Sequence, residues 1–316
     1  MKKHRKILNT QNNKGITLVA LVITIIVLLI LAVIAIRTIT DDSIINYAKN
    51  ASAEYKLSEE EENSKLENYL EIIDESVPLN VETIPAAQSY VGYYADINGD
   101  NTVDGIIYAD FATGSSGEWG TEGLGKYTVA KKENLDKYYI IKGEHQESGF
   151  PVKPVVAPVN KKATNDRFYV MSLNDFTDGT YTQFSWYTNA QVGSDGLMTD
   201  FESATSADFE TGRANSITMI DKIYGNGLVD GDIWKQARSK ITEGWFVPSN
   251  AEWSAFVVNL GITAAERSNY ALNDTYWTST QYNSCTACLA DFVDIDEIGA
   301  FWGPFTQYSI RLSTTF

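Results

Sequence analysis

The stretch GWFVPSNAEW, residues 244–253, decides how the C-terminal part of this chain folds. Three apolar residues and Pro248 come first, Ser249 follows at once, and Glu252 lies three positions further on. This is the spacing of a capping box, in which the serine side chain accepts from the glutamate N–H and the glutamate side chain accepts from the serine N–H. The stretch therefore predicts a helix that begins at Ser249.

Outward from this helix, short aromatic or β-branched runs alternate with turns rich in Gly, Asn and Asp. These patterns predict strands at 138–142, 167–172 and 180–188, and helices at 213–224, ending at Gly225, and at 232–240. Thr263 and Glu266 repeat the capping spacing and predict a short helix. At 308–316, apolar and polar residues alternate, which predicts a half-exposed strand. The fold class expected is α+β, with strands from both ends of the domain meeting.

Charge, hydropathy and Gly/Pro content divide the chain into five segments. Residues 1–15 form a basic leader, and residues 16–36 form an uncharged apolar run. Residues 37–76 are expected to continue as a stalk helix. Residues 77–88 contain two prolines and indicate a linker to an ectodomain at 89–316.

The apolar run 16–36 is expected to be a transmembrane helix. At roughly 1.5 Å per residue it would extend about 30 Å, the thickness of the hydrocarbon core of a bilayer. The basic residues before it place the N-terminus in the cytoplasm and the C-terminal domain outside the cell. A cleaved secretory signal is the weaker interpretation, because its apolar region would be shorter. The expected localisation is therefore the cell membrane, with a single helix as the anchor.

Charge is distributed unevenly along the chain. Residues 1–40 hold six basic and no acidic residues, which leaves 19 basic against 41 acidic residues in the remainder, a balance of −22. Such a surface repels the phosphates of nucleic acids. Nucleic acid is therefore excluded as a partner.

The join Lys14-Gly15-Ile16-Thr17-Leu18 between the leader and the apolar run resembles the prepilin-type cleavage and methylation motif. The resemblance covers residues 1–40. It implies that a prepilin peptidase cuts between Gly15 and Ile16 and that the new N-terminus is methylated. The family usually has a glutamate at the fifth mature position, where this chain has Ala20. That departure counts against assembly into a filament, and a simple apolar anchor is the alternative interpretation.

Four phrases in the C-terminal part resemble the C-type-lectin-fold domains of the FISUMP and sulfatase-modifying-factor-like group. They are GWFVPS at 244–249, EW at 252–253, YWTST at 276–280 and IRL at 310–312. The resemblance covers roughly residues 90–316. It implies that the first and last strands pair and that a long irregular segment before the last strand forms the ligand face. The C-terminal arrangement also looks like that of variable proteins of diversity-generating retroelements.

The stretch 283–307 fits such a ligand face, because no helical or strand period runs through its mixture of residues. The resemblance implies a variable segment here, with Ala287, Ala290 and Phe292 as its fixed scaffold. Exposed aromatic residues would supply contact area, and acids would set the charge preference. The candidate ligand-binding residues are Ser284, Cys285, Thr286, Leu289, Asp291, Val293, Asp294, Asp296, Glu297, Phe301, Trp302 and Phe305. The alternative is an ordinary loop whose aromatic side chains enter the core.

The stretch DINGDNTVD, residues 96–104, resembles the Ca²⁺ loop of EF-hands and dockerins, because oxygen-bearing side chains recur at alternate positions. The candidate ligands are Asp96, Asn98, Asp100, Thr102 and Asp104. Two features are missing, since position six is Asn101 rather than Gly and position twelve is Ile107 rather than Glu. A turn stabilised by side-chain hydrogen bonds to the backbone is therefore favoured over a Ca²⁺ site.

No catalytic constellation can be assembled from the sequence. Cys285 and Cys288 have a C-x-x-C spacing without a βαβ pattern around them, which favours a local disulfide or two thiols over redox chemistry. His4 and His145 are far apart, and neither has a marked nucleophile or third partner. The protein is therefore not expected to be an enzyme.

Three hypotheses about function follow. The leading one is a surface-displayed ligand-binding protein, adhesin- or receptor-like, whose segment 283–307 contacts a host, phage or cell-surface ligand. The second is a minor pilin or pseudopilin that caps or decorates a filament. The third is an ectoenzyme, which the missing constellation opposes.

Overall fold

The computed structural model describes residues 18–40, 56, 81–85, 87–120, 123–147, 149–159, 165–187, 201, 203–224, 230–293 and 297–316. The chain divides into two compact units, Met1–Leu79 and Asn80–Phe316. The expected cleavage site at Gly15 and Ile16 and most of the stalk at 37–76 lie outside the described residues.

The first unit contains the helix α1 (Leu18–Thr40). Among the described residues, no helix combines the length and the apolar character that crossing a membrane requires. This finding contradicts the predictions of a transmembrane helix at 16–36 and of a single-pass protein with a cytoplasmic N-terminus.

The second unit is built around a seven-stranded sheet with the strand order β1-β6-β7-β2-β3-β8-β14. Its strands are β1 (Val81–Thr83), β2 (Tyr94–Ala95), β3 (Gly105–Asp110), β6 (Tyr138–His145), β7 (Lys153–Pro158), β8 (Phe168–Ser172) and β14 (Ser313–Thr315). Neighbours run antiparallel except β2 and β7, which are parallel. The first and last strands lie at opposite edges, so the expected pairing between them is wrong, and β14 pairs with β8 instead. β1 falls inside 77–88, the range that indicated a linker.

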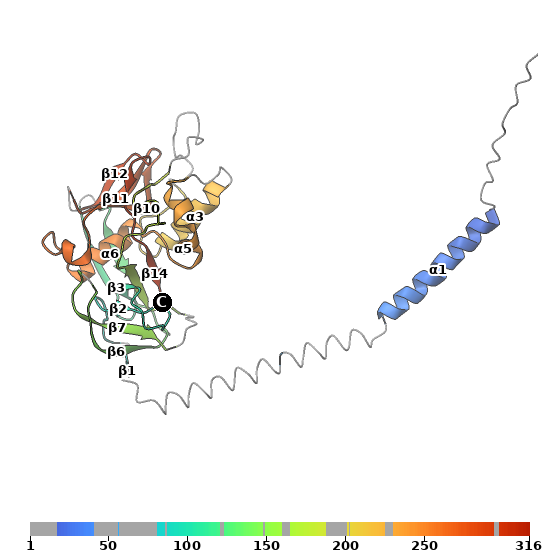
Figure 1. Ribbon diagram of the computed structural model, residues 1–316, viewed down its shortest axis with the longest axis horizontal. Coiled ribbons are helices and arrows are strands. Elements are labelled where there is room, and N and C mark those ends of the chain that lie inside the picture. The colour runs from blue at the N-terminus through green and yellow to red at the C-terminus, as the bar shows by residue number, and fades with distance from the viewer. Residues whose placement is uncertain are drawn as a thin grey trace, which may run out of the picture. The chain divides into compact units, whose positions relative to one another are not determined.

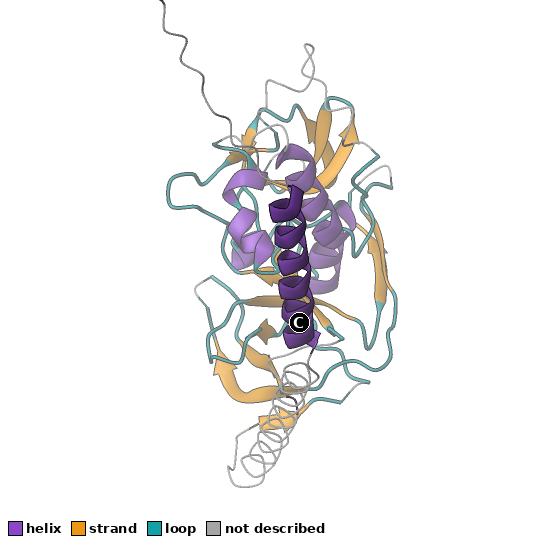
Figure 2. Ribbon diagram, turned by 90° about the vertical axis from the view of Figure 1, so that its right-hand side faces the viewer, coloured by secondary structure: helices purple, strands orange, loops and turns teal. Residues whose placement is uncertain are grey.

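Three smaller sheets and a group of helices complete the described part of this unit. β10 (Thr275–Asn283), β11 (Thr286–Asp291) and β12 (Glu297–Trp302) form one sheet, β9 (Phe184–Ser185) pairs with β13 (Gln307–Tyr308), and β4 (Ser115–Glu118) pairs with β5 (Lys126–Val129). The helices are α3 (Gly212–Tyr224), α4 (Ile233–Gln236), α5 (Arg238–Thr242), α6 (Asn250–Leu260) and the 3₁₀ helix η1 (Arg267–Tyr270). Figure 1 shows β11 and β12 at one end of the unit and β1 and β6 at the other. Figure 2 shows strands at both of these ends.

The unit is mainly β, which corrects the expected α+β class with its N-terminal transmembrane and stalk helix. β3 shows why the sequence pattern predicts fewer strands than the structure contains. Ile106 and Tyr108 pack in one core and Ile107 packs in another with Val170 and Phe316, so every residue of the strand is buried. A strand buried on both faces has no alternation of apolar and polar residues to detect.

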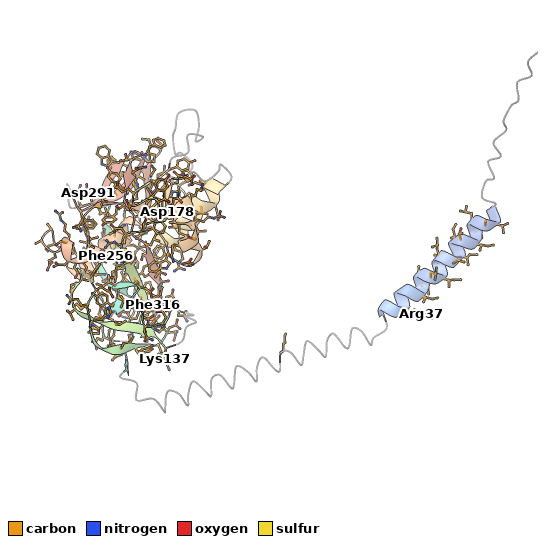
Figure 3. The ribbon with its side chains drawn as sticks, viewed as in Figure 1. Arg37, Lys137, Asp178, Phe256, Asp291 and Phe316 are labelled. Carbon is orange, nitrogen blue, oxygen red and sulfur yellow. The ribbon has the colours of Figure 1, made fainter. Side chains whose placement is uncertain are left out.

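Helix α6 connects the main sheet to the sheet β10–β12, since it contacts β3 as well as all three strands of the smaller sheet. The predicted capping box is confirmed. The Ser249 side chain accepts from the Glu252 N–H at 3.3 Å, and the Glu252 carboxylate accepts from the Ser249 N–H at 2.7 Å. The side chains of Trp253 and Phe256, two residues of α6, are fully buried in the core. Figure 3 labels Phe256. The capping box, which can be read from the sequence, therefore sets the start of the helix that joins the two sheets.

The C-terminal segment runs through three parts of the unit. β13 pairs with β9, Ser309 bridges to Tyr276 of β10, and β14 pairs with β8. The prediction of a half-exposed strand at 308–316 is wrong. Ser309, Arg311 and Ser313 are buried, because their side chains form hydrogen bonds inside the protein.

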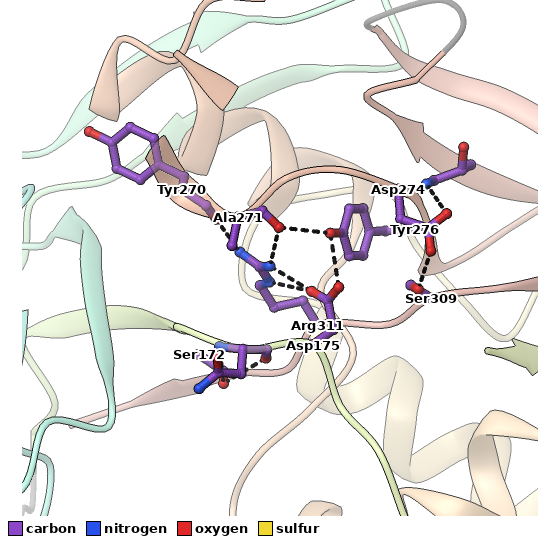
Figure 4. Close-up of polar contacts among 10 residues, drawn as sticks. Ser172, Asp175, Tyr270, Ala271, Asp274, Tyr276, Ser309 and Arg311 are labelled. Atoms are coloured by element: carbon purple, nitrogen blue, oxygen red, sulfur yellow. Dashed lines mark hydrogen bonds and ion pairs between the residues drawn. The ribbon is translucent and has the colours of Figure 1, made fainter. Parts of the chain in front are cut away.

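The Arg311 guanidinium, which is 1% exposed, holds together segments that are distant in the sequence (Figure 4). Its Nε and Nη2 donate to Asp175 Oδ1 at 2.9 and 2.5 Å. Its Nη1 donates to the Tyr270 carbonyl at 2.7 Å, and Nη2 also donates to the Ala271 carbonyl at 2.8 Å. Tyr276 of β10 donates its hydroxyl proton to Asp175 Oδ2 at 3.2 Å. The loop after β8, the end of η1 and strand β10 therefore meet at one side chain.

Replacing Arg311 by methionine should lower the free energy of unfolding by about 1–3 kcal/mol, because the change leaves the Tyr270 and Ala271 carbonyls without their donor, whereas the partly exposed Asp175 carboxylate can be hydrated. Urea denaturation followed by circular dichroism measures the loss. Arg238→Met, at an exposed position on α5, is the matched control and should stay within about 0.5 kcal/mol of the parent protein. Equal stability of the two variants would contradict the role given to Arg311.

Glu252 is a buried carboxyl at the start of α6. Burial raises its pKa from the ordinary 4.5 to about 7, although hydrogen bonds from the backbone N–H groups of Ser249 and Gly212 act in the opposite direction. Gly212 approaches so closely that a Cβ there would lie 2.1 Å from the Glu252 carboxylate. Between pH 4.5 and about pH 7, the Glu252 carboxyl is protonated in the folded protein but ionised in the unfolded chain. The stabilisation from this group is therefore complete below pH 4.5 and is lost as the pH rises through about 7.

Glu252→Gln should remove this part of the pH dependence, since glutamine keeps the shape and an acceptor for the cap. Chemical denaturation between pH 4.5 and pH 8 should show the parent protein losing on the order of 3 kcal/mol more than the variant over that interval. Glu266→Gln, at an exposed glutamate, serves as the control and should keep the parental slope. Identical slopes for the parent protein and Glu252→Gln would rule the assignment out.

Candidate functional site: an exposed aromatic face

The candidate site lies on the three-stranded sheet β10–β12, at one end of the second unit (Figure 1). β11 runs antiparallel to both of its neighbours, so β10 and β12 are the outer strands. The register irregularities after Trp277 and Gln281 in β10 bend this strand near its end. The sheet packs on α6 on one side, which leaves side chains at the ends of β10 and β12 free to face outward.

Four exposed aromatic side chains lie near the ends of β10 and β12 and in the turn after β12, and together we call them the aromatic face: Tyr282, Phe301, Trp302 and Phe305. Their exposed fractions are 37%, 44%, 55% and 52%, respectively. The rings of Tyr282 and Phe301 are stacked, with centroids 4.1 Å apart and planes inclined by 5°. Such a pair is worth about 0.5–1.5 kcal/mol beyond the area it buries, so it holds the two outer strands together as well as presenting a flat surface.

The turn that carries Phe305 is tied to the rest of the unit. Thr306 N–H donates to the Gly303 carbonyl at 3.2 Å, which closes the turn. Tyr187 N–H donates to the buried Pro304 carbonyl at 3.1 Å, and the Ser185 hydroxyl donates to the Phe305 carbonyl at 3.1 Å. Because the backbone is bonded on both sides, the exposed ring of Phe305 is presented by a fixed turn.

The structure divides the predicted ligand-binding residues into three groups. Cys285, Val293, Phe301, Trp302 and Phe305 are exposed, Ser284, Thr286 and Glu297 are half-buried, and Leu289 and Asp291 are buried, whereas Asp294 and Asp296 lie outside the described residues. The three residues expected as a fixed scaffold, Ala287, Ala290 and Phe292, are buried. β11 is therefore buried over 287–291, and the exposed residues lie in the turns before and after it, at the end of β12 and in the turn that follows β12.

Leu289 and Asp291 cannot contact a ligand on this surface. Leu289 packs in a core cluster with Trp277 and Ile310. The Asp291 carboxylate accepts from the Thr275 hydroxyl at 3.1 Å and from the Val293 N–H at 2.9 Å. An acid that satisfies buried donors stabilises the fold, so Asp291 does not belong to an acidic rim.

Tyr282 is the member of the aromatic face that the sequence analysis missed, because it precedes the stretch 283–307. A signal for it exists. Tyr276 and Trp277 begin a run that reads as a strand, and Tyr282 comes at its end, just before the turn-forming Asn283 and Ser284. An aromatic residue at the last position of a strand that leads into a recognition segment belongs on the candidate list.

The two cysteines are free thiols in different surroundings. Cys285 is exposed, and its thiol lies 3.3 Å from Asn283 Oδ1. Cys288 is buried, and burial raises the pKa of its thiol to about 11. A thiol that stays protonated is a poor nucleophile.

The loop 96–104 has the geometry of a turn held by its own aspartates. Asp96 is buried, and its carboxylate accepts from the N–H groups of Gly99, Asp100 and Asn101 at 2.7, 3.1 and 2.8 Å. Asp104 accepts from the Ile97 N–H at 2.8 Å, and burial raises its pKa. Among the described residues, no group of three or more His, Cys, Asp or Glu side chains is arranged to hold a metal ion.

Ile107, at the position where an EF-hand has its bidentate glutamate, is a fully buried residue of β3. The candidate Ca²⁺ ligands Asn98, Asp100 and Thr102 also bond within the loop. Asn98 accepts from the Asp100 N–H at 2.9 Å, and Asp100 accepts from the Thr102 N–H at 2.9 Å. These contacts fit the turn interpretation that the sequence favoured.

No protein-family model and no curated protein matches this chain. Among solved structures, a fimbrial protein from Bacteroides ovatus ATCC 8483 is a neighbour, with 15% identity and a TM-score of 0.33. The match covers 48% of this chain and 36% of that protein. A likeness at this TM-score supports no argument about fold or function.

Proposed function

We propose that the aromatic face is a recognition surface and that the protein is a ligand-binding protein of the adhesin or receptor type, with a protein as its ligand. The single observation that carries the proposal is the exposure of four aromatic side chains near the ends of β10 and β12 and in the turn that follows. Tyr282, Phe301, Trp302 and Phe305 are each more than a third exposed, and Tyr282 stacks on Phe301. Large exposed apolar surface is uncommon on soluble domains and marks interaction sites.

The chemistry of these residues suits protein recognition. Trp and Tyr are enriched among the residues that dominate binding energy at protein interfaces, and aromatic side chains bury much area while losing few rotamers. The stacking of Tyr282 on Phe301 and the hydrogen bonds that fix the turn at Phe305 lower the conformational entropy lost on binding, because the surface is already ordered. Nucleic acid is disfavoured as the ligand, because the chain beyond residue 40 carries a balance of −22.

Peptides selected on the full-length protein from a phage-displayed random library provide the test. Trp302→Ala and Phe305→Ala should each weaken the selected peptides by about tenfold or more, as expected for hot-spot residues. Both side chains are exposed, so the variants should unfold at the parental temperature. Bound peptide should also protect Trp302 from acrylamide quenching, since this is an exposed indole whereas Trp186, Trp234, Trp253 and Trp277 are buried.

Ile217→Ala is the matched control, because Ile217 on α3 is 47% exposed and does not belong to the aromatic face. Its affinity for the peptides should equal that of the parent protein. The proposal fails if peptides bind Trp302→Ala and Phe305→Ala as tightly as they bind the parent protein and the control.

We also propose a second candidate function, that of a filament subunit, on one observation in α1. Val19, Leu28 and Leu29 are at least 60% exposed, and apolar side chains are exposed throughout 19–34. A helix that is apolar all round is stable in water only when another surface covers it. The prepilin-like join at Gly15 and Ile16 supports α1 of further copies as that surface.

Leu28→Lys should reduce polymer formation, because it places a charge in the helix contact. Sedimentation of the full-length protein and electron microscopy of the pellet measure polymer. Val258→Lys, an equivalent change at an exposed position on α6, is the control and should leave polymer unchanged. Equal pelleting of both variants and the parent protein would remove this second candidate.

A further inference from the structure

A cavity of about 530 Å³ opens in the second unit beside the start of α3, strand β8 and strand β14. It shares no lining residue with the aromatic face. The charged residues that line it are Lys132, Glu133, Asp166, Glu210 and Arg213. Cations and carboxylates thus face the same small volume, next to the aromatic rings of Phe111 and Tyr169.

Arg213 is held in a defined orientation at this cavity. Its Nη2 donates to the Thr315 hydroxyl at 2.8 Å, and that hydroxyl donates in turn to the Asp166 carboxylate. The guanidinium also lies over the ring of Phe246, 5.4 Å from its centroid. Its Nε and Nη1 have no hydrogen-bond partner among the described residues. A fixed guanidinium with spare donors is suited to a carboxylate.

The opposite wall is built by Lys132 and Glu210, which form an ion pair. The Lys132 ammonium lies 3.6 Å above the centroid of the Phe111 ring. Glu210 has a φ of 72°, a left-handed conformation that non-glycine residues rarely adopt. Its backbone N–H bonds to the buried Glu252 carboxylate, which helps to hold this conformation. Backbone strain of this kind concentrates at sites with a function.

Tyr169 supplies a neutral hydroxyl. The residue is 6% exposed, and its ring is surrounded by Phe111, Phe209 and Phe246. Burial raises its pKa, and the charges of Glu210 and Arg213 also act on it, so the hydroxyl lies near the charged wall of the cavity. This hydroxyl has no hydrogen-bond partner among the described residues and, unlike the ring, it is open to water in the cavity.

We propose that this cavity binds a small zwitterion, namely a free α-amino acid. Its carboxylate would accept hydrogen bonds from Arg213 and the Tyr169 hydroxyl, and its ammonium group would donate to Glu133 and Asp166. The site is independent of the aromatic face, so either proposal can fail without the other.

The balance of charge favours a zwitterion over a simple ion. Three carboxylates against two cations leave the lining with a net charge of −1, which would repel a phosphate dianion. A ligand that carries one charge of each sign meets complementary groups at both ends.

The test is thermal unfolding of the full-length protein in the presence of the standard L-amino acids, one at a time. At least one of them should raise the unfolding temperature in a saturable way, because a ligand that binds only the folded state stabilises it. Sodium acetate and methylammonium chloride each carry only one of the two charged groups. At matched ionic strength, neither salt alone nor the two together should raise the unfolding temperature in a saturable way. If no amino acid gives a saturable rise, or if the salts give the same rise, the proposal is wrong.

Variants then place the binding in the cavity. Tyr169→Phe keeps the enclosed ring and should weaken the active amino acid about tenfold or more, the effect of losing one hydrogen bond to a charged group. Arg213→Lys keeps the charge, loses the planar fork and should weaken it about tenfold or more. Tyr282→Phe removes a hydroxyl on the aromatic face and is the matched control. Parental affinity in both Tyr169→Phe and Arg213→Lys would show that the amino acid binds elsewhere and would overturn the proposal.

Discussion

The buried guanidinium of Arg311 is the constraint on which the arrangement of the second unit depends. A charge this far from water has to be paired and hydrogen-bonded, and the partners available to it are Asp175, the Tyr270 carbonyl and the Ala271 carbonyl. These groups come from the loop after β8 and from the end of η1. The contacts of the C-terminal segment with β8, β9 and β10 therefore depend on the correct placement of those segments.

The same constraint explains why the aromatic face can be rigid. β10 is fixed at one end by Tyr276, whose hydroxyl bonds to Asp175, and by the bridge between Tyr276 and Ser309. Further along, the indole of Trp277 donates to the Phe184 carbonyl at 2.8 Å, which joins β10 to β9. The exposed rings stand on strands anchored below them. A surface that is ordered before binding loses less conformational entropy when a ligand arrives.

Features that depend on residues close together in the chain could be predicted from the sequence, whereas burial that depends on distant partners could not. The capping box at Ser249 and Glu252 and the helix at 213–224 depend on neighbouring residues, and both were predicted closely. The C-terminal residues were misread because Arg311 and Ser313 look like surface residues until their distant partners are known. The sequence also predicts Leu289 and Asp291 as ligand-binding residues, although both are buried. Phe301, Trp302 and Phe305, which it predicts for the same surface, are exposed.

Aromatic residues therefore serve two opposite purposes in this unit, and their surroundings decide which. Around Tyr169, the rings of Phe111, Phe209 and Phe246 meet edge-on or tilted and hold the tyrosine ring, so its hydroxyl lies beside the charged side chains of the cavity. Near the ends of β10 and β12, Tyr282 and Phe301 stack in parallel and are each more than a third exposed. The first arrangement suits selection of a small polar molecule, since it fixes donors and acceptors in place. The second suits a large partner, since its affinity comes from area that only another macromolecule can cover.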